Sequence, residues 1–515
     1  MLMKIKIYYT LYIIVVSLAL FGCTKNFDTI NTNPNSSTVS RADWLATSMI
    51  TSVTSSDISS QKSFMQPFML GKYILWSEDQ EGYQYNSLGQ TSFSRISVLR
   101  NVAPMLKYAA DDKNTYPSYL GLTHFLRAWQ FFQLTMQVGD VPYAQALKGE
   151  SEGNVKPAYD AQKDVFLGIL KELDQADSAF AAGSKFTGDF IYGGDVVKWR
   201  RLANSFQLHV LMNLYKKTSD NDLNVVQKFK TVLTRPLMQS FDDNFAVTYI
   251  NTSGSCYPWS STAVQKNQFT IYPMVSSTLI DSLKKYNDRR LFYYTEPAKS
   301  AITGGLTAND FNAYIGVEPS DAYSSITGKH ASGAFSDVNK RYVDLYNAEP
   351  VSLFSYWELQ FILAEATVRG WISGVSAQDY YAAGIQGSMN FLVKYTPATY
   401  NHGMALDASY ISNYPSTVAL TGDADNQIKQ IITQKYLAGF LQGADFNAWY
   451  EFRRTGYPQF KLNPSTNLNT PSAQFPVRWK YPQVELNNNA DNYKAANQSQ
   501  YGGNDDVNQV MWLLK

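Results

Sequence analysis

The 515-residue chain has few cysteines and almost no net charge. Cys23 and Cys256 are its two cysteines, so at most one disulfide could form within a chain and disulfides cannot be the framework of the fold. The 44 Lys and Arg residues nearly balance the 43 Asp and Glu residues, which leaves a formal net charge of +1. A chain with this balance has no broad electrostatic attraction for nucleic acid or anionic lipid. We therefore expect a fold stabilised by a hydrophobic core, and no nucleic-acid partner.

The chain also lacks the sequence patterns of common catalytic and metal sites. It contains no nucleophile elbow of the G-x-S-x-G type and no phosphate-binding loop. Its four histidines are scattered without metal-ligand spacing: His124, His209, His330 and His402. Apolar neighbours of His124 and His209 indicate packed histidines rather than ligands. We expect no catalytic residues, no metal and no cofactor.

Two pairs of carboxylates keep a carbohydrate-active hydrolase open as the least favoured alternative. Glycosidases place two carboxylates roughly 5 to 10 Å apart across a cleft. Glu78 with Asp79, and Glu358 with Glu365, are the pairs that stand out. The second pair is seven residues apart, which is about 10 Å along a helix. Because Glu365 lies in a repeat-like helical segment, a structural role is favoured for it.

Long apolar runs are scarce as well, and the clearest one is N-terminal. Residues 8–22 contain hardly a polar side chain, and Lys4 and Lys6 precede them. A membrane-spanning helix needs about 20 apolar residues, so this run is short for an anchor. A basic start, a short apolar stretch and a small residue at its end are typical of a secretory signal peptide. We predict that residues 1–22 are a signal peptide.

The residues around Cys23 indicate how the exported protein is held. Leu20, Phe21, Gly22 and Cys23 resemble the bacterial lipobox, although Phe21 replaces the usual small residue. The alternatives are a chance cysteine after an ordinary signal peptide, or a small buried hydrophobe. We predict that Cys23 is lipidated. Residues 24–40 are polar and rich in Asn and Ser, so residues 23–40 are expected to be a lipid-anchored flexible tether.

Several later segments have the periodicity of amphipathic helices. One stripe, behind the possible cap Asp160 and before Gly183, consists of Val165, Ile169, Leu173, Ala176 and Phe180. A second stripe, behind Asp195, consists of Trp199, Leu202, Phe206, Val210 and Leu214. Residues 356–370 and 379–392 continue the pattern, and residues 119–140 are apolar nearly all round. Paired helices with Ala and Gly at contact positions resemble tetratricopeptide-type hairpins.

Other segments show no helical period and carry Gly, Pro, Ser and Asn between aromatic residues. They are residues 251–273, 301–350 and 455–482. Long irregular segments of a compact domain are more often functional than accidental. We predict a mostly α fold in which tetratricopeptide-like hairpins pack with an irregular, loop-rich half containing short strands. Residues 41–515 are expected to form this single domain.

Aromatic residues are plentiful, with 36 Tyr, 28 Phe and 10 Trp. A glycan-binding face needs such rings for stacking, with polar side chains beside them. Residues 73–86 and 256–272 fit this description best, and residues 314–325 fit it less well. The candidate ligand-binding residues are Trp76, Tyr83, Tyr85, Asn86, Tyr257, Trp259 and Tyr323. For any single ring, ordinary core packing is the simpler interpretation.

Four segments of the chain carry a resemblance to a known family. They are "VGDVPYAQAL" (138–147), "YWELQFILAEA" (356–366), "QKYLAGFLQGADFNAWYEFRRTGYP" (434–458) and "RWKYPQVELNNNADNYKAA" (478–496). In order and spacing they resemble the SusD/RagB family of Bacteroidetes outer-membrane lipoproteins. The resemblance extends from "CTKNFDTINTNPN" at the predicted mature N-terminus to the C-terminus. It therefore covers essentially the whole mature chain.

The resemblance implies a function as well as a fold. In that family the helical repeats pack against a TonB-dependent outer-membrane transporter of the SusC-like type. The loop-rich half captures a nutrient, usually a glycan and sometimes a peptide, and performs no chemistry. The resemblance thus implies a lipid-anchored outer-membrane protein facing the cell exterior. A peptide-capturing protein of the same fold is the alternative to glycan capture.

The matching motifs have simple structural interpretations. Gly139, Pro142 and Tyr143 are expected to form a rigid turn that ends the preceding buried helix. Arg453 and Arg454 lie at an amphipathic helix end, where ion pairs or carbonyl contacts are favoured over ligand contacts.

Overall fold

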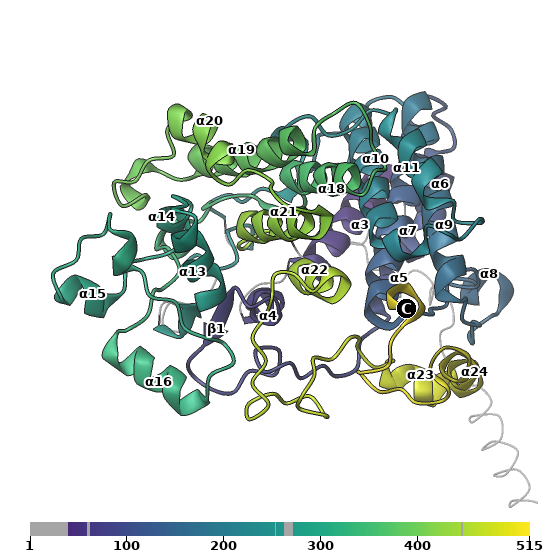
Figure 1. The fold of residues 1–515 in the computed structure, drawn as a ribbon. Coiled ribbons are helices and arrows are strands. Elements are labelled where there is room, and N and C mark those ends of the chain that lie inside the picture. The colour runs from purple at the N-terminus through teal and green to yellow at the C-terminus, as the bar shows by residue number, and fades with distance from the viewer. Residues whose placement is uncertain (1–39, 59–61, 253, 262–270, 444–445) are drawn as a thin grey trace, which may run out of the picture. The chain divides into compact units, whose positions relative to one another are not determined.

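The computed structural model describes residues 40–58, 62–252, 254–261, 271–443 and 446–515. Within it, Ala42–Lys515 form one compact unit (Figure 1). The predicted signal peptide, Cys23 and the tether as far as residue 39 lie outside the described residues. In the described part of the chain, no helix is both long and apolar enough to cross a bilayer.

Helices dominate the unit, which confirms the predicted mostly α fold. The helices of the first half are α3 (Ala42–Asp57), α4 (Lys62–Leu70), α5 (Ser94–Val98), α6 (Val102–Ala109), α7 (Tyr116–Val138), α8 (Gly149–Glu152), α9 (Gln162–Ala182), α10 (Val196–Asn213) and α11 (Val225–Leu233). Those of the middle are α13 (Ser277–Lys285), α14 (Leu291–Tyr294), α15 (Lys299–Thr303), α16 (Tyr323–Ser332), α17 (Arg341–Asp344), α18 (Tyr356–Val368), α19 (Ala377–Tyr395), α20 (Ala408–Thr417) and α21 (Ala424–Ala438). The last are α22 (Asn447–Thr455), α23 (Gln483–Asn488) and α24 (Ala490–Tyr501).

The longest helix, α7, packs against α9 as a helical hairpin. The predicted stripe of α9 is buried along its whole length. A Cβ on Gly121 of α7 would lie 2.8 Å from the ring of Phe180, so the helices approach closely there. Gly139 ends α7 with a φ of 91°, which confirms the expected turn. The predicted cap at Asp160 is wrong, because α9 starts after Ala161 without a side-chain cap.

Asp160 instead binds the turn that follows α7. Its Oδ2 accepts hydrogen bonds from the backbone N–H groups of Tyr143 and Ala144, both at 2.9 Å. The carboxylate of Asp160 therefore accepts hydrogen bonds from the turn after α7 and does not cap α9. The prediction at Asp195 is confirmed, since its side chain accepts the N–H groups of Val197 and Lys198 at the start of α10.

The hairpin of α18 and α19 repeats the close approach of the first one. Gly384 of α19 faces Phe361 of α18, and a Cβ on the glycine would lie 2.9 Å from that ring. Small residues at helix contacts, as the sequence predicts, let both backbones come close. In Figure 1, α7, α9 and α10 lie together on one side of the unit, while α13 to α16 lie on the opposite side.

The irregular half has short strands, as predicted, but it also has short helices. The strands are β1 (Ile74–Trp76), β2 (Phe245–Val247), β3 (Pro273–Val275) and β4 (Val351–Phe354). β1 pairs antiparallel with β3, with Ile74 opposite Val275, and β2 pairs antiparallel with β4. Residues 456–482 are irregular apart from a bridge at Lys480. Residues 301–350, predicted to be loop and strand, contain α16 (10 residues), α17 (4 residues) and much of α15 (5 residues).

The apolar side chains form two large buried clusters. One lies among α3, α7, α9 and α10, and the other lies among α4, α13, α19 and α21. The second cluster is rich in Tyr and Trp from the irregular half. Many of the aromatic residues of the chain therefore belong to the core, and a fully buried ring cannot form part of an exposed binding face.

Candidate ligand-binding site

Trp76, Tyr85 and Tyr323 are brought to one region of the irregular half. Tyr85 donates its hydroxyl to the carbonyl of Asp321 at 3.1 Å, and Tyr323 donates to the carbonyl of Ser77 at 3.2 Å. Trp76 is 1% exposed and Tyr85 is 3% exposed. These contacts fasten the segment after β1 to the start of α16. The first two rings are packed inside it, and Tyr323 is half-buried.

Asn86, also expected at the ligand site, is buried in a polar anchor. Lys72 donates its ammonium to the carbonyl of Gln84 at 2.6 Å and to Oδ1 of Asn86 at 2.8 Å. Asn86 in turn donates its amide to Asn467 at 3.2 Å. Burial lowers the pKa of Lys72 to about 7, although Glu318 acts in the opposite direction. Asn86 therefore holds a turn in place.

Tyr257 and Trp259 are fully buried and belong to the same apolar cluster as Trp76. Both meet the ring of Phe64 edge to face, with centroids 6.1 and 5.8 Å apart. Tyr83 is half-buried and packs on Phe446, with centroids 5.6 Å apart. The expected platform of exposed rings is thus not formed by Trp76, Tyr85, Tyr257 and Trp259, because their apolar area stabilises the core. A ligand role for Tyr83 and Tyr323 stays a prediction.

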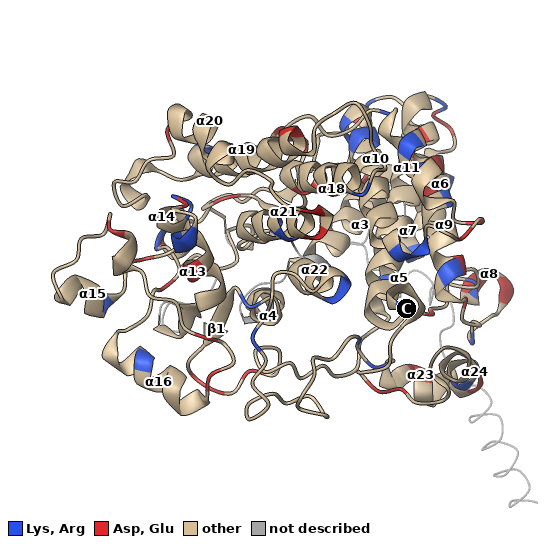
Figure 2. Cartoon of the chain, in the orientation of Figure 1, with Lys and Arg blue, Asp and Glu red and all other residues tan. Residues whose placement is uncertain are grey.

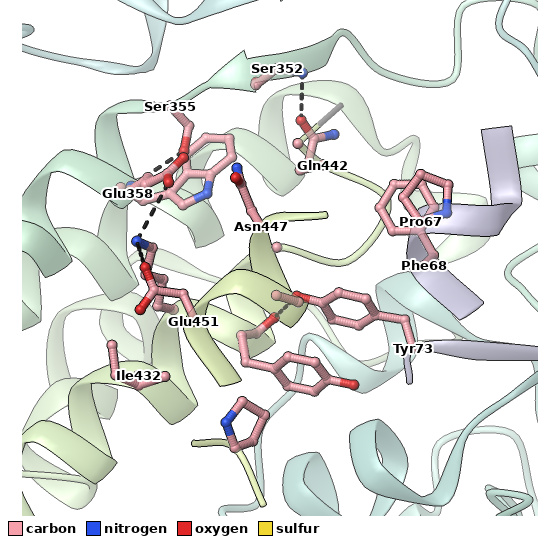
Figure 3. A pocket seen from close by; sticks show the side chains of 17 residues that line it. Pro67, Phe68, Tyr73, Ser352, Ser355, Glu358, Ile432, Gln442, Asn447 and Glu451 are labelled. Carbon is pink, nitrogen blue, oxygen red and sulfur yellow. Dashed lines mark hydrogen bonds and ion pairs between the residues drawn. The ribbon is translucent and has the colours of Figure 1, made fainter. Parts of the chain in front are cut away.

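A small cavity lies among α4, α18, α21 and α22 (Figure 3). Pro67, Phe68 and Tyr73 lie on one side of it, opposite Glu358 and Glu451. Its volume is about 50 Å³. This is far below the roughly 300 to 1,000 Å³ usual for ligand pockets, so the cavity suits a few ordered waters rather than a sugar ring.

Charged side chains continue from this cavity into the helical core. Acidic residues lie on α18, a lysine lies near the end of α21, and both kinds of charge lie on α22 (Figure 2). Lys435 Nζ lies 3.4 Å from Glu358 Oε1 and 2.8 Å from Glu451 Oε1. Arg454 bonds both oxygens of Glu365 at 2.7 Å and Glu451 Oε2 at 2.5 Å. The structural role predicted for Glu365 and Arg454 is confirmed.

Burial and the neighbouring cations shift the pKa values of these carboxylates. Burial raises the pKa of Glu358. Burial also opposes ionisation of Glu451, but Arg454 and Lys435 hold the pKa of that carboxyl well below its usual range. Burial lowers the pKa of the neighbouring His209 to about 3. The cluster is a set of ion pairs inside the scaffold, and the cavity beside it is much smaller than a usual ligand pocket.

The structure also places the two helical histidines and Arg453. His209 is buried, as expected, whereas His124 is partly exposed on α7 and lies 2.5 Å from Glu172. Arg453 donates to the carbonyls of Met136 and Val477, both at 2.9 Å, which confirms its predicted carbonyl contacts.

A larger and more open groove lies between the end of α13 and helix α20, and we call it the α13–α20 groove. Its volume is about 500 Å³, within the range of roughly 300 to 1,000 Å³ usual for ligand pockets. The residues that line it are Lys285, Tyr286, Asn287, Arg289, Asp407, Ser409, Tyr410, Asn413, Tyr414 and Thr417. Tyrosine rings, hydroxyls and amides thus meet at one surface.

The α13–α20 groove was not predicted from the sequence. Its two walls are more than a hundred residues apart in the chain, and neither wall alone is unusually aromatic. The motif "YISNY" (410–414), with two tyrosines one helical turn apart, is the one signal that pointed to it. A further groove of about 540 Å³ lies between α7 and α9, where Pro117, Leu120, Ala179 and Ala182 contribute apolar surface.

Comparison with known proteins matches most of the chain to one family. Residues 34–482 match the SusD-like family described as "Starch-binding associating with outer membrane". A SusD homologue from Bacteroides fragilis is 39% identical, with a TM-score of 0.88, and the match covers 92% of this chain and 100% of that one. A protein from Bacteroides vulgatus, linked by its description to the outer membrane and nutrient binding, is 34% identical with a TM-score of 0.82, over 92% and 100% of the two chains.

A chitin-binding protein is also similar in structure, with 25% identity and a TM-score of 0.72, over 92% of this chain and 99% of that one. Among curated protein sequences no match was found. The family match and the two more similar structures confirm the resemblance seen in the sequence, and this chain belongs to the SusD-like family of outer-membrane-associated, nutrient-binding proteins.

Proposed function

We propose that this protein is a cell-surface lipoprotein that captures an oligosaccharide and delivers it to a TonB-dependent outer-membrane transporter of the SusC-like type. The observation that carries the proposal is the family match over residues 34–482, whose description combines starch binding with the outer membrane. The similarity to a chitin-binding protein over 92% of the chain favours a glycan as cargo. The α13–α20 groove offers an exposed hollow large enough for a sugar.

Binding of purified mature protein to a panel of neutral and acidic oligosaccharides and short peptides, measured by calorimetry, tests the cargo. We expect saturable binding of at least one oligosaccharide. Saturable binding of peptides with no binding of any oligosaccharide would make the protein a peptide-capturing member of the family. Turnover of a bound glycan that disappears in Glu78→Gln or Asp79→Asn would instead indicate a hydrolase.

The lipid anchor is tested by Cys23→Ser. Because the described unit begins at Ala42, this change should release the protein from the membrane fraction without changing its thermal unfolding. A matched control is Cys256→Ser, which leaves the proposed acylation site intact. Membrane partitioning of the Cys23→Ser variant, together with no acyl label on the wild type, would contradict the proposal.

The transporter is tested by co-expression with a TonB-dependent barrel of the SusC-like type, and a gene for such a barrel beside the gene for this chain would identify the candidate. We expect the two chains to purify together through an interface of at least about 1,000 Å², too large to be lost by one substitution. Recovery of the barrel without this chain, from cells that express both, would refute delivery to that transporter.

A further inference from the structure

Arg289 is held rigidly in the wall of the α13–α20 groove. Its guanidinium carbon lies 4.3 Å from the ring centroid of Tyr410, and that ring stacks on Tyr414 with centroids 5.3 Å apart. NH1 of Arg289 donates to the carbonyl of Ala405 at 2.8 Å and to Asp407 Oδ2 at 3.4 Å. The side chain is therefore positioned before any ligand arrives, which reduces the ordering cost of binding.

This arrangement leaves part of the guanidinium unused. An arginine carries five N–H donors, and the two protein contacts both use NH1. Within the described part of the chain, Nε and NH2 of Arg289 have no hydrogen-bond partner. Adjacent N–H groups of a planar guanidinium match two oxygens of a carboxylate or sulfate. Arg289 therefore has the geometry of an anion-binding group.

Lys285 adds a second cation to the same groove. Its side chain is exposed, and its ammonium lies 5.3 Å from the ring centroid of Tyr286 but forms no ion pair with a described residue. Among the described residues that line the groove, Asp407 is the one carboxylate. Asp407 is already engaged, since Oδ1 accepts the N–H of Tyr410 at 2.8 Å and Oδ2 accepts from Arg289. The groove thus has a surplus of positive charge.

The rest of the groove suits a sugar. Tyr286 is half-buried, so part of its ring is open to the C–H face of a pyranose. On the opposite wall, Ser409, Asn413 and Thr417 of α20 are exposed and supply hydroxyl and amide groups for sugar hydroxyls.

We propose that the α13–α20 groove binds an acidic oligosaccharide, with a carboxylate or sulfate held by Arg289 and Lys285 and a sugar ring lying against Tyr286. The inference rests on the proposed function, because it assumes a saccharide as cargo. It deepens that function by assigning the site and by restricting the ligand to anionic sugars.

The test uses pairs of ligands that differ in charge alone. Purified mature protein is titrated with oligogalacturonate and its methyl ester, and with a sulfated galactan oligosaccharide that lacks uronic acid and its desulfated, uncharged form. A chitin oligosaccharide is the neutral probe. We expect one charged ligand to bind at least about tenfold more tightly than its neutral partner, because one charge-assisted hydrogen bond contributes about that difference in affinity. Its affinity should fall with rising salt. Which charged member binds distinguishes carboxylate from sulfate.

Three variants assign the binding to the groove. Lys285→Gln removes an exposed charge and should weaken the acidic ligand by about tenfold. Arg289→Lys keeps the charge but loses the planar fork, and should also weaken it. Asn413→Trp fills the groove from an exposed helical position and should abolish binding. The matched control is Lys494→Gln, an exposed lysine of α24, which should bind as the wild type does. Unchanged melting curves show that each variant is folded.

The outcomes separate this inference from the proposed function. Equal binding of charged and neutral sugars, or acidic-sugar binding that survives Lys285→Gln and Asn413→Trp, would overturn the inference while glycan capture stands. Binding of chitin oligosaccharide alone would do the same. Failure of every oligosaccharide to bind would overturn both. Loss of acidic-sugar binding in the folded Asn413→Trp variant, with Lys494→Gln unaffected, would support the inference.

Discussion

Replacing Arg454 by Met should destabilise the protein strongly, because the guanidinium neutralises two buried carboxylates. Arg454 bonds both oxygens of Glu365 at 2.7 Å and lies 2.5 Å from Glu451 Oε2. Methionine fills similar space without the charge, so the variant retains packing and loses the ion pairs. Breaking a buried ion pair by removing one partner costs about 3 to 5 kcal/mol.

The remaining cations place the expected loss at the lower end of that range. Glu365 keeps Arg369 at 2.7 Å, and Glu451 keeps Lys435 at 2.8 Å. We therefore expect the free energy of unfolding to fall by about 3 kcal/mol at neutral pH. Urea unfolding followed by tryptophan fluorescence measures this as a lower midpoint at an unchanged slope. The control is Lys394→Met, which removes an exposed pair with Asp242 and should cost no more than about 1 kcal/mol.

The pH dependence gives a second measurement on the same variant. In the wild type the pKa values of Glu365 and Glu451 are lowered, although burial opposes this, because Arg454 lies beside both. Their contribution is present above the unfolded pKa of 4.5 and is lost as the pH falls below it. Without Arg454 the buried acids should protonate more easily, so the deficit should shrink on acidification. A loss below about 1 kcal/mol, or a deficit independent of pH, would refute the reasoning.

Three further predictions concern stability. Trp259→Ala empties a fully buried site, so it should lower the free energy of unfolding by about 3 to 5 kcal/mol. Calorimetry should show unchanged ligand affinity, and a weakened affinity in a folded variant would show that the ring contacts the ligand. Burial raises the pKa of Asp337 from 3.8 to about 8. Stability of the wild type should therefore decrease relative to Asp337→Asn as the pH rises from about 4 to about 8, and parallel pH profiles would contradict this. Gly121→Ala places a methyl group against the buried ring of Phe180 and should cost about 1 to 3 kcal/mol, seen as a lower melting temperature; no loss would mean that α7 and α9 can separate.

Much of the helical scaffold was predictable because its signals are local. The buried stripe from Val165 to Phe180, the cap at Asp195 and the turn at Gly139 each depend on residues within a few turns of one another. The family was recognisable for the same reason, since its motifs are short contiguous segments. The structural role of Arg454 also followed from its place at the end of an amphipathic helix.

The sequence alone determined that this is a mostly α chain with an irregular aromatic half, of the SusD-like family. The tertiary structure alone decided which aromatic rings are exposed. Trp259 packs against Phe64 in the core, and Arg289 lies against the ring of Tyr410 in the wall of the α13–α20 groove. These partners are more than a hundred residues apart, whereas helical periodicity and capping act over a few residues. Burial and pocket formation depend on contacts between distant segments, so no local pattern distinguishes a core tyrosine from one that lines a groove.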